Sequence, residues 1–551
     1  MKVIIIGGVA GGMSSATRLR RLMDDAEIVV YEKSGFVSYA NCGLPYFVGG
    51  VIEDEASLLL QTPTSLFERF RIDVRVNHEV TSINATDRTV TVTELTTGHT
   101  ETTGYDVLVL SPGASAVVPP IAGIERAMAL RTVEDVEKIV AVADENPANA
   151  VVIGGGFIGV EIAENLVHRG IATSVVEASG QVLAPLDLEM AELVADEMRK
   201  KGVSLYLNES VVRIDERGVE LSSGDFVEGE LVIVAIGVRP ETGLARGAGL
   251  DIGERGGIAV DEFNRTSVAS IYAIGDAAEK RDALDSSATL VPLANIANRQ
   301  GRVVADHIAG LDVRPLPTIG TAIVKVFDLT IAATGWNEKR LRAMGRSPLI
   351  IHTHPSSHAG YFPGAKQMAL KLLVDRSTGA IYGAQGVGTE GVDKRIDVIA
   401  TAIRAGITAP ELADLELAYA PPFGSAKDPV NMLGYIAENL LSGLEENVQW
   451  YELDEYRAEG VTMIDVRSVS EFARGSIPGT LNIPLDELRV RFDEIETREV
   501  IVNCQVGQRG HVATQLLNQH GFKAKNLDGG YLTWSKSPAS RPLELAGVSH
   551  D

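Results

Sequence analysis

Cys42 and Cys504 are the two cysteines of this 551-residue chain, and they stand in different surroundings. Cys42 lies in SYANCGLPYF, a few dozen residues after a glycine-rich loop and without a second cysteine beside it. Cys504 lies in VNCQVGQRGH, near the other end of the chain. Because the thiolate is the nucleophilic form of cysteine, either residue needs neighbours that position it and lower its pKa.

Two stretches of the chain each predict a strand, a glycine-rich turn, a helix and a second strand that ends in an acid. The first runs through MKVIII, GGVAGG, MSSATRLRRLM and AEIVVYE to Glu32, and the second is NAVVIGGGFIGVEIAENLVHRGIATSVVE, which ends at Glu177. The pattern G-x-G-x-x-G is complete in the second copy, whereas Val9 replaces the middle glycine of the first. Such loops place a pyrophosphate on free N–H groups at a helix N-terminus. The repetition predicts two nucleotide-binding units rather than two ordinary α/β turns.

The acid at the end of the second unit bears on the choice of nucleotide. A carboxylate in that place accepts hydrogen bonds from a ribose 2′-hydroxyl and repels a 2′-phosphate. Glu177 therefore favours NADH over NADPH, and the alternative is a solvated carboxylate at a strand end.

The composition restricts the partners and the compartment. With 74 acidic and 50 basic side chains the chain repels nucleic acid and anionic lipid. The longest apolar runs are too short to span a bilayer, the N-terminus lacks the features of a signal peptide, and two cysteines build no disulfide framework. We therefore expect a soluble cytoplasmic protein of three or four domains.

Three further stretches carry a family resemblance, namely VLVLSPGASA, LVIVAIGVRPET and SVASIYAIGDAAE. In this order, and together with the two glycine loops, they resemble the flavin-dependent pyridine nucleotide-disulfide oxidoreductases over about the first 440 residues. The resemblance implies an FAD-binding domain at 1–115 and 246–320, an NAD(H)-binding domain at 116–245 and a dimerisation domain at 321–446 of a homodimer. It assigns cofactor binding to Gly7, Gly12, Glu32, Lys33, Ser111, Pro112, Gly113, Gly154, Gly156, Gly159, Glu177, Gly237, Gly275 and Asp276. Asp276 would bind the ribityl chain of the flavin, although Gly-Asp alone also fits a strand-ending turn.

The surroundings of Cys42 resemble the coenzyme A-disulfide reductase branch of this family, in which one cysteine replaces the usual pair. A single thiol is oxidised to a mixed disulfide with a small thiol, to a sulfenic acid or to a persulfide. The sulfur partner of Cys42 would then arrive as substrate. Closeness to a flavin and a helix N-terminus would lower the pKa of Cys42 and make it a nucleophile. The alternative is an inert buried cysteine.

A basic cluster follows the first glycine loop. Arg18 and Arg21 lie three residues apart on one helix face, and Arg20 adds charge beside them. They could clamp the phosphates of coenzyme A, and the alternative is a solvated helix face. The resemblance implies a coenzyme A site made by Ser14, Arg18, Arg21, Ser38, Asn41, Asn298 and Lys427, although the family has glutamine at the position of Arg18 and histidine at that of Asn298.

Two tyrosines in the predicted dimerisation domain match the same branch. Tyr361 lies in HAGYFPGA and Tyr419 in ELAYAPPFGSAKDPVNMLGY. The resemblance implies that both approach the active site of the partner subunit, where a hydroxyl could donate a proton to a departing thiol. The alternative is a pair of core aromatics.

A group of histidines lies close to Tyr361 in the sequence. His352, His354 and His358 form H-x-H-x-x-x-H, but no cysteine or acid completes a zinc site in that stretch. We therefore predict surface histidines and no metal.

The last hundred residues, from about 447 to 551, strongly resemble a rhodanese domain. Cys504 would open a loop that ends at Arg509 before a helix. Such a loop directs backbone N–H groups at its centre, which favours a thiolate able to carry a sulfane sulfur. The spacing C-x-x-x-x-R is one residue shorter than in phosphatase loops, which disfavours a phosphatase or arsenate reductase.

The sequence thus predicts an α/β chain with two Rossmann-like nucleotide-binding domains, an α+β dimerisation domain and a C-terminal α/β rhodanese domain. The expected activity is reduction of coenzyme A persulfide, polysulfide or related persulfides by NADH through FAD and Cys42, with sulfane sulfur supplied by Cys504. Three alternatives remain open at this point: a coenzyme A-disulfide reductase, an NADH oxidase or peroxidase, and a sulfurtransferase or redox-responsive binding protein with a flavin scaffold.

Overall fold

The computed structural model describes residues 1–540 and divides the chain into two compact units. The first unit comprises Met1–Gly180 and Arg199–Thr318. The second comprises Gln181–Met198 and the chain from Ile319 onward. Each unit contains two sheets of five strands. Cys504 directly follows a strand of one of these sheets, whereas Cys42 lies in the short helical turn Asn41–Gly43.

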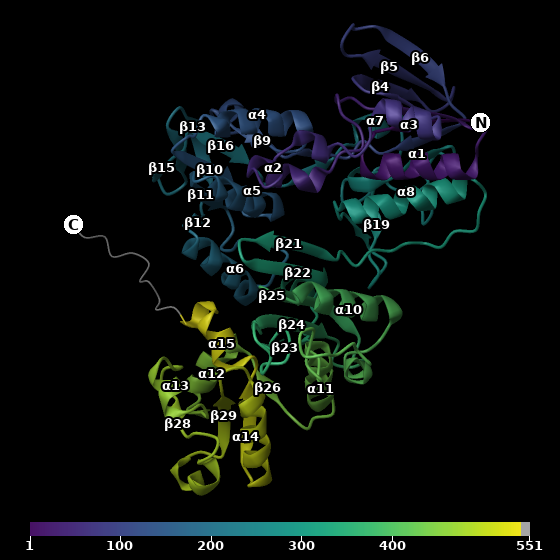
Figure 1. Ribbon diagram of the computed structural model, residues 1–551. Helices are drawn as coiled ribbons and strands as arrows, with labels where there is room; N and C mark the ends of the chain where they lie inside the picture. Colours follow the sequence, from purple (N-terminus) through teal and green to yellow (C-terminus); the bar gives the residue numbers. More distant parts are fainter. Residues whose placement is uncertain (541–551) are drawn as a thin grey trace. The chain divides into compact units, whose positions relative to one another are not determined.

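The first sheet of the first unit is parallel and has the order β18 (Ile271–Ala273), β7 (Val107–Leu110), β1 (Lys2–Ile6), β2 (Glu27–Tyr31) and β3 (Asp73–Arg75). Its central strands are continuous apolar runs because both faces of the sheet are covered. Helices α1 (Ala10–Leu22) and α8 (Ala294–Ile308) lie side by side (Figure 1). They pack so closely that a methyl group on Gly301 would lie 2.4 Å from the carbonyl oxygen of Gly11. Smaller elements complete this part: α2 (Leu44–Val48), α3 (Pro63–Phe70), α7 (Gly243–Gly247), β4 (His78–Asn84), β5 (Thr89–Glu94), β6 (Thr100–Gly104), β19 (Lys280–Arg281) and β20 (Ala288–Thr289).

The second sheet of this unit repeats the first. It is parallel, with the order β12 (Ser204–Leu207), β11 (Ala172–Glu177), β10 (Asn149–Ile153), β16 (Leu231–Val234) and β9 (Met128–Ala129). Around it lie α4 (Val133–Asp144), α5 (Phe157–His168), β13 (Val211–Asp215), β14 (Gly218–Leu221) and β15 (Phe226–Glu228). A short antiparallel pair, β8 (Ala114–Ala116) and β17 (Val238–Pro240), connects the two halves. The predicted duplication of Rossmann-like sheets is confirmed.

The second unit begins with an antiparallel sheet of order β21 (Ala322–Val326), β22 (Leu329–Gly335), β25 (Ile381–Gly388), β24 (Met368–Val374) and β23 (Leu349–Thr353). Helices α9 (Glu338–Ala343), α10 (Val392–Ala405) and α11 (Pro429–Leu441) accompany it. The apolar faces of α10 and α11 and the sheet bury one core, which includes Leu370, Leu372, Ile396, Ile399 and Leu433. This arrangement is the expected α+β dimerisation domain.

The C-terminal sheet is parallel, with the order β26 (Asn447–Val448), β30 (Lys523–Leu527), β29 (Glu499–Asn503), β27 (Thr462–Asp465) and β28 (Leu481–Asn482). Its helices are α12 (Leu453–Ala458), α13 (Val469–Ala473), α14 (Gln508–Gln519) and α15 (Gly530–Ser535). Cys504 follows β29 directly, at the carboxyl edge of the sheet where ligands of open α/β sheets bind.

A buried cluster of charges forms part of the second unit. Lys371 on β24 is fully buried, and its Nζ lies 2.6 Å from Glu189 Oε1, 2.6 Å from Glu338 Oε2 and 3.0 Å from Asp187 Oδ2. Although burial opposes its charge, the three carboxylates raise the pKa of Lys371, and Lys371 lowers the pKa of Glu189. Asp187 and Glu189 come from Gln181–Met198, the stretch that contains the start of α6 (Leu188–Lys200). The oxygens of these three acids would suit a metal ion, but the Lys371 ammonium group already lies within 3.0 Å of all three carboxylates.

The histidines near this cluster correct one prediction. His352 and His358 are buried, not exposed, and His354 is partly buried. His352 Nδ1 lies 2.6 Å from Asp528 Oδ2, and its Nε2 lies 2.9 Å from Glu189 Oε1. Although burial opposes the charge, these carboxylates raise the pKa of His352 to about 9. The prediction of surface histidines is wrong because the partners of His352 come from segments more than 160 residues away, which no local pattern reveals.

Candidate active sites

The two glycine loops have the same construction. Gly7 and Gly154 adopt φ values of +100° and +109°, which favour glycine. A methyl group on Gly12 would lie 1.9 Å from the carbonyl oxygen of Gly7, and one on Gly159 would lie 1.9 Å from that of Gly154. Helix and strand can therefore approach each other only with glycine at these positions.

The acid at the end of the second strand of each β-α-β unit accepts a hydrogen bond from its glycine loop. Glu32 Oε2 accepts a hydrogen bond from the Gly8 N–H at 2.7 Å, and Glu177 Oε2 accepts one from the Gly155 N–H at 2.7 Å. Val9 has a φ of −112°, so the missing middle glycine of the first loop imposes no strain. At Gly156 a methyl group would meet nothing within 4 Å, which leaves space before the N-terminus of α5. Both loops therefore fit a dinucleotide pyrophosphate.

Asp276 lies in the 3-10 turn Gly275–Ala277 and is paired with an arginine. Its Oδ2 lies 2.6 Å from a guanidinium nitrogen of Arg131, whose Nε donates to the carbonyl oxygen of Ala114 at 2.9 Å. Gly113 and Gly275 have φ values of +76° and +70°, so both loops turn tightly at this point. The sequence analysis missed Arg131, because nothing in its local pattern marks an arginine that folds back over two distant loops.

The other predicted cofactor residues lie at strand ends. Ser111 follows β7, and its N–H donates to the carbonyl oxygen of Ile6 at 2.8 Å, with Pro112 next in the chain. Gly237, with a φ of +122°, precedes β17, and Lys33 is exposed after β2. Their contacts with a cofactor stay predictions.

Cys42 sits in a single 3-10 turn (Asn41–Gly43) that leads into α2, and its side chain is exposed. Ser38 has a φ of +50°, and its N–H donates to the carbonyl oxygen of Gly8 at 2.8 Å, which ties this segment to the first glycine loop. Within residues 1–540 the buried Oδ1 atom of Asn41 has no hydrogen-bond partner. Because buried polar atoms are nearly always paired, Asn41 is suited to contact a ligand beside Cys42.

Glu161 on α5 is an acid that the sequence analysis did not select. The Tyr46 hydroxyl donates to Glu161 Oε1 at 3.4 Å, and burial raises the pKa of Glu161 to about 7. Partial desolvation by the surrounding residues raises the pKa of the Cys42 thiol, and so do the carboxylates of Glu161 and Asp276. The guanidinium of Arg131 lowers it. The protein groups alone therefore act against the expected thiolate. One signal was present in the sequence: Glu161 interrupts the apolar and small residues of FIGVEIA, the first two turns of its helix.

Replacing Glu161 by Gln should lower the pKa of Cys42. A carboxylate disfavours a nearby thiolate, so its removal stabilises the charged form of the sulfur. The rate of Cys42 alkylation by iodoacetamide should then rise at a lower pH than in the unaltered protein, with Cys42 followed separately from Cys504 by peptide mass spectrometry. Glu137→Gln on α4 is the matched control and should leave the profile in place. An unchanged or higher Cys42 pKa in Glu161→Gln would contradict this assignment.

The predicted coenzyme A residues of the first unit are partly brought together. Ser14 Oγ donates to Asn298 Oδ1 at 2.8 Å between α1 and α8. Arg18 pairs with Asp306 at 2.6 Å, whereas the guanidinium of the exposed Arg21 has no partner within the described part of the chain. Arg20 is buried, and it donates to the carbonyl oxygens of Met23, Asp24, Ala26, Phe70 and Arg71. Arg20 therefore holds the end of α1 in place and adds no free charge to a phosphate clamp.

Tyr361 and Tyr419 meet in the second unit. Their hydroxyl oxygens lie 2.8 Å apart, and the residues are 76% and 47% exposed. The alternative of core aromatics is therefore wrong for both. The hydrogen bond from Tyr419 raises the pKa of Tyr361. Lys427 is also exposed, with its Nζ 5.9 Å from the ring of Tyr435.

Backbone hydrogen bonds hold the loop of Cys504 at the end of β29. The Cys504 side chain is fully buried, and the Gly507 N–H lies 3.2 Å from its Sγ. The Tyr531 N–H donates to the carbonyl oxygen of Cys504 at 2.8 Å, and the Leu532 N–H donates to that of Gln505 at 3.0 Å. Gly507, with a φ of +94°, turns the chain into α14. A backbone donor directed at the sulfur agrees with the loop geometry expected for a sulfur carrier.

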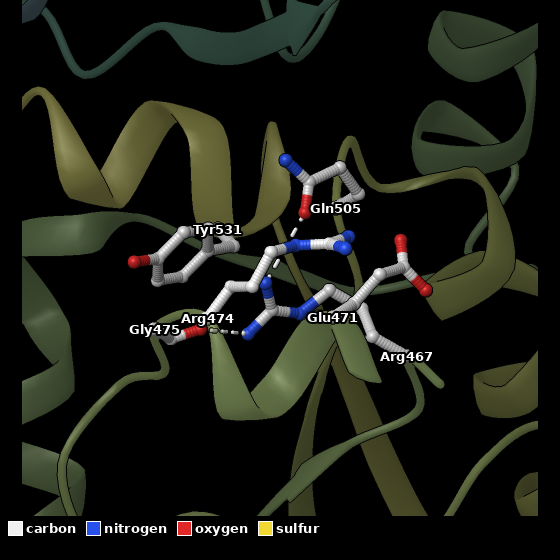
Figure 2. A pocket seen from close by; sticks show the side chains of 6 residues that line it. All are labelled: Arg467, Glu471, Arg474, Gly475, Gln505 and Tyr531. Atoms are coloured by element: carbon white, nitrogen blue, oxygen red, sulfur yellow. Dashed lines mark hydrogen bonds between the residues drawn. The ribbon is translucent and has the colours of Figure 1, made fainter. Parts of the chain in front are cut away.

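Arg509 at the end of this loop is paired. Its two terminal nitrogens lie 2.8 and 2.7 Å from the two carboxylate oxygens of Glu471, and this pairing lowers the pKa of Glu471 to about 2. Beside the loop lies a pocket of about 310 Å³ (Figure 2). The residues that line it are Arg467, Glu471, Arg474, Gly475, Gln505 and Tyr531. The sequence analysis had named none of these six.

Comparisons with known proteins agree with both halves of the chain. Residues 1–301 match the pyridine nucleotide-disulphide oxidoreductases, 321–429 match the dimerisation domain of the same family, and 449–537 match the rhodanese-like domain. A coenzyme A disulfide reductase of Staphylococcus aureus is 35% identical over 441 residues, which are 79% of this chain and 100% of that protein. The chain belongs to the pyridine nucleotide-disulphide oxidoreductases. It is therefore an oxidoreductase that uses FAD and NAD(H), and it carries a rhodanese domain in addition.

Two solved structures resemble the chain over nearly its whole length. A reduced CoADR-RHD protein of Bacillus anthracis is 48% identical, with a TM-score of 0.96 over 97% of this chain and 98% of the other. An NAD-dependent persulfide reductase of A. fulgidus is 39% identical, with a TM-score of 0.91 over 97% of this chain and 100% of the other. Among residues 1–540, no helix of this oxidoreductase is long and apolar enough to cross a membrane.

Proposed function

We propose that this oxidoreductase uses NADH to reduce the persulfide of coenzyme A to coenzyme A and sulfide through Cys42, and that Cys504 supplies the sulfane sulfur. The observation that carries the proposal is the pairing of two unlike thiols in one chain. Cys42 is exposed beside Asn41, whose amide oxygen has no hydrogen-bond partner within residues 1–540, whereas the buried Cys504 lies in a loop beside a pocket. A symmetrical disulfide needs only the first of these sites.

The reaction at Cys42 balances in two steps. The Cys42 thiolate attacks the coenzyme A sulfur of the persulfide, so that a disulfide between Cys42 and coenzyme A forms while the outer sulfur leaves as sulfide. Two electrons and one proton then return this disulfide to the Cys42 thiolate and the free thiol of coenzyme A. Bound FAD would supply the electron pair that NADH delivers. The net change is CoA–SSH + NADH + H⁺ → CoA–SH + H₂S + NAD⁺.

The side chains around the two loops would hold the cofactors and the substrate. Glu32 and Glu177 fix the loops on which the pyrophosphates would rest, and the carboxylate of Glu177 favours NADH over NADPH. In the first unit Arg21 and Asn298 are exposed and Ser14 is partly buried, and in the second unit Lys427 is exposed. We assign these four residues to coenzyme A binding. A cytoplasmic location of the protein stays a prediction.

Proton transfer falls to the paired tyrosines. Because Tyr361 and Tyr419 are exposed and joined by one hydrogen bond, they can present a hydroxyl proton to a group outside their own unit. We assign them to the Cys42 site of the partner subunit in a homodimer, where they would protonate the departing thiol. The dimerisation domain of the family supports this arrangement.

Steady-state kinetics with alternative substrates tests the proposal. With NADH as reductant, kcat/KM should be at least about tenfold higher for coenzyme A persulfide than for coenzyme A disulfide. The reason is that sulfur transfer from Cys504 to coenzyme A yields the persulfide and not the disulfide. The second candidate is a coenzyme A-disulfide reductase, favoured by the 35% identity to the staphylococcal enzyme. Equal or greater efficiency on the disulfide would establish that candidate instead, and a preference for peroxide would establish an NADH peroxidase. A flavin that NADH does not bleach would leave only the sulfurtransferase or binding-protein alternative.

A further inference from the structure

Arg395 on α10 is an arginine that the second unit encloses completely. The residue is 1% exposed, and its guanidinium donates to the carbonyl oxygen of Ser357 at 3.0 Å and to Asp428 Oδ2 at 2.9 Å. Its Nε donates to Asp428 Oδ1 at 3.3 Å, and its Nη1 donates to the carbonyl oxygen of Gly391 at 3.2 Å. The guanidinium therefore joins the segments around Ser357 and Asp428, which lie far apart in the sequence.

These two segments carry the paired tyrosines. Tyr361 belongs to 357–366 and Tyr419 to 415–428, two stretches that contain neither helix nor strand. Because Tyr361 is 76% exposed and Tyr419 is 47% exposed, packing gives their rings little support. The distance of 2.8 Å between their hydroxyl oxygens is therefore set by buried contacts elsewhere in the two stretches.

Buried contacts hold the two stretches together. Besides the hydrogen bonds of Arg395, the Ala359 N–H donates to the carbonyl oxygen of Gly424 at 2.9 Å. Asp428 is 3% exposed and also caps the N-terminus of α11. The Nζ of Lys394, which is partly exposed, lies 3.5 Å from Asp428 Oδ2, so Arg395 is the closer counterion of this carboxylate. A charge-assisted fork of this kind fixes geometry as well as charge.

We propose that Arg395 is a positioning residue that keeps Tyr361 and Tyr419 within hydrogen-bond distance of each other. The inference rests on the proposed role of these tyrosines in proton transfer. Arginine is suited to this task because its planar fork donates to Ser357 and Asp428 at the same time. A lysine would keep the charge but lose the fork, so Arg395→Lys separates the geometry from the neutralisation of the buried carboxylate.

Fluorine NMR of the full-length protein reports on the tyrosine pair directly. With Tyr361→3-fluorotyrosine as the probe, Tyr419→Phe should shift the fluorine resonance because the hydrogen bond between the hydroxyl groups is lost. Arg395→Lys should produce at least about half of that shift, and it should add nothing when it is combined with Tyr419→Phe. Arg404→Lys, at an exposed position of the same helix, is the matched control and should leave the resonance in place.

Asp428→Asn provides a second variant for the same measurement. Asparagine also caps a helix well, so α11 is retained while the guanidinium loses the charge of its partner. The resonance should shift in the same direction as in Arg395→Lys, and this variant decides the question where Arg395→Lys does not fold. An unchanged resonance would overturn the inference, and so would a shift that adds fully to that of Tyr419→Phe.

Steady-state kinetics separate this inference from the proposed function. In Arg395→Lys, kcat for coenzyme A persulfide should fall about tenfold, whereas KM for NADH should change less than about twofold. If Tyr419→Phe is impaired and Arg395→Lys is not, the inference is overturned. If Tyr419→Phe itself keeps its full kcat, the tyrosines do not deliver the proton and the proposed function fails at that step, while the fluorine resonance still decides whether Arg395 holds the pair.

Discussion

Replacing Cys42 by Ser should reduce NADH-dependent turnover of coenzyme A persulfide and coenzyme A disulfide by about 10³-fold or more. A serine hydroxyl remains protonated at neutral pH and forms no disulfide, so neither the attack nor the return of electrons can occur. Sulfur transfer to cyanide, measured as thiocyanate, should stay within about twofold of the unaltered protein, because Cys504 lies in a separate sheet. NADH should still bleach the flavin of this variant.

Cys504→Ser is the reciprocal control. It should lose thiocyanate formation while it retains reduction of coenzyme A persulfide that is supplied directly. Persulfide reduction that persists in Cys42→Ser would show that Cys42 is not the redox thiol. Loss of both activities in either variant would indicate that the two thiols act as one site.

Replacing Lys371 by Met should lower the free energy of unfolding of the second unit by about 3–5 kcal/mol at pH 7. The substitution preserves the volume and leaves Asp187, Glu189 and Glu338 buried without their common cation. All three tryptophans, Trp336, Trp450 and Trp534, belong to this unit, so tryptophan fluorescence during urea denaturation reports it selectively. Lys366→Met, at an exposed position of the same domain, is the matched control and should change the midpoint little.

The same variant makes a prediction for pH. Lys371 lowers the pKa of Glu189 and of Glu338 below the ordinary value of 4.5, so their stabilising contribution is complete above pH 4.5 and is lost as the pH falls through the lowered values. In Lys371→Met the carboxyl groups can instead be protonated when the pH approaches their ordinary range. The deficit should therefore be largest above pH 4.5 and should shrink below it. A deficit that grows on acidification would contradict the role given to Lys371.

The fold followed from the sequence because its signals are local. The glycine loops, the apolar strands and the two strand-end acids lie within stretches of about thirty residues, and each of them specifies a β-α-β unit by short-range packing. Gly12 and Gly159 are required by a contact with a backbone oxygen five residues earlier. The loop from Cys504 to Arg509 was recognisable for the same reason.

The interaction partners of the charged side chains in the sites could not be predicted from local sequence patterns. Arg131 meets Asp276 across 145 residues, and His352 meets Asp528 across 176. Arg20 and Arg21 are neighbours with equal charge, yet one is enclosed by five carbonyl groups and the other is exposed. Whether an arginine is a structural donor or a free cation depends on which distant carbonyls surround it, and that information is absent from local spacing.

The contact between His352 and Asp528 limits how freely the rhodanese domain can be exchanged between related chains. Asp528 is followed by Gly529, where a methyl group would lie 2.8 Å from the β-carbon of His352, and by Gly530, where one would lie 2.5 Å from the carbonyl oxygen of Cys504. Asp528, Gly529 and Gly530 therefore both pack the rhodanese domain against His352 and shape the loop that contains Cys504. A rhodanese domain grafted from another protein without Asp-Gly-Gly at this point would remove one of the two acidic partners of the buried His352 imidazole and would displace Cys504. Recombination between such fused chains should therefore exchange both domains of the second unit together.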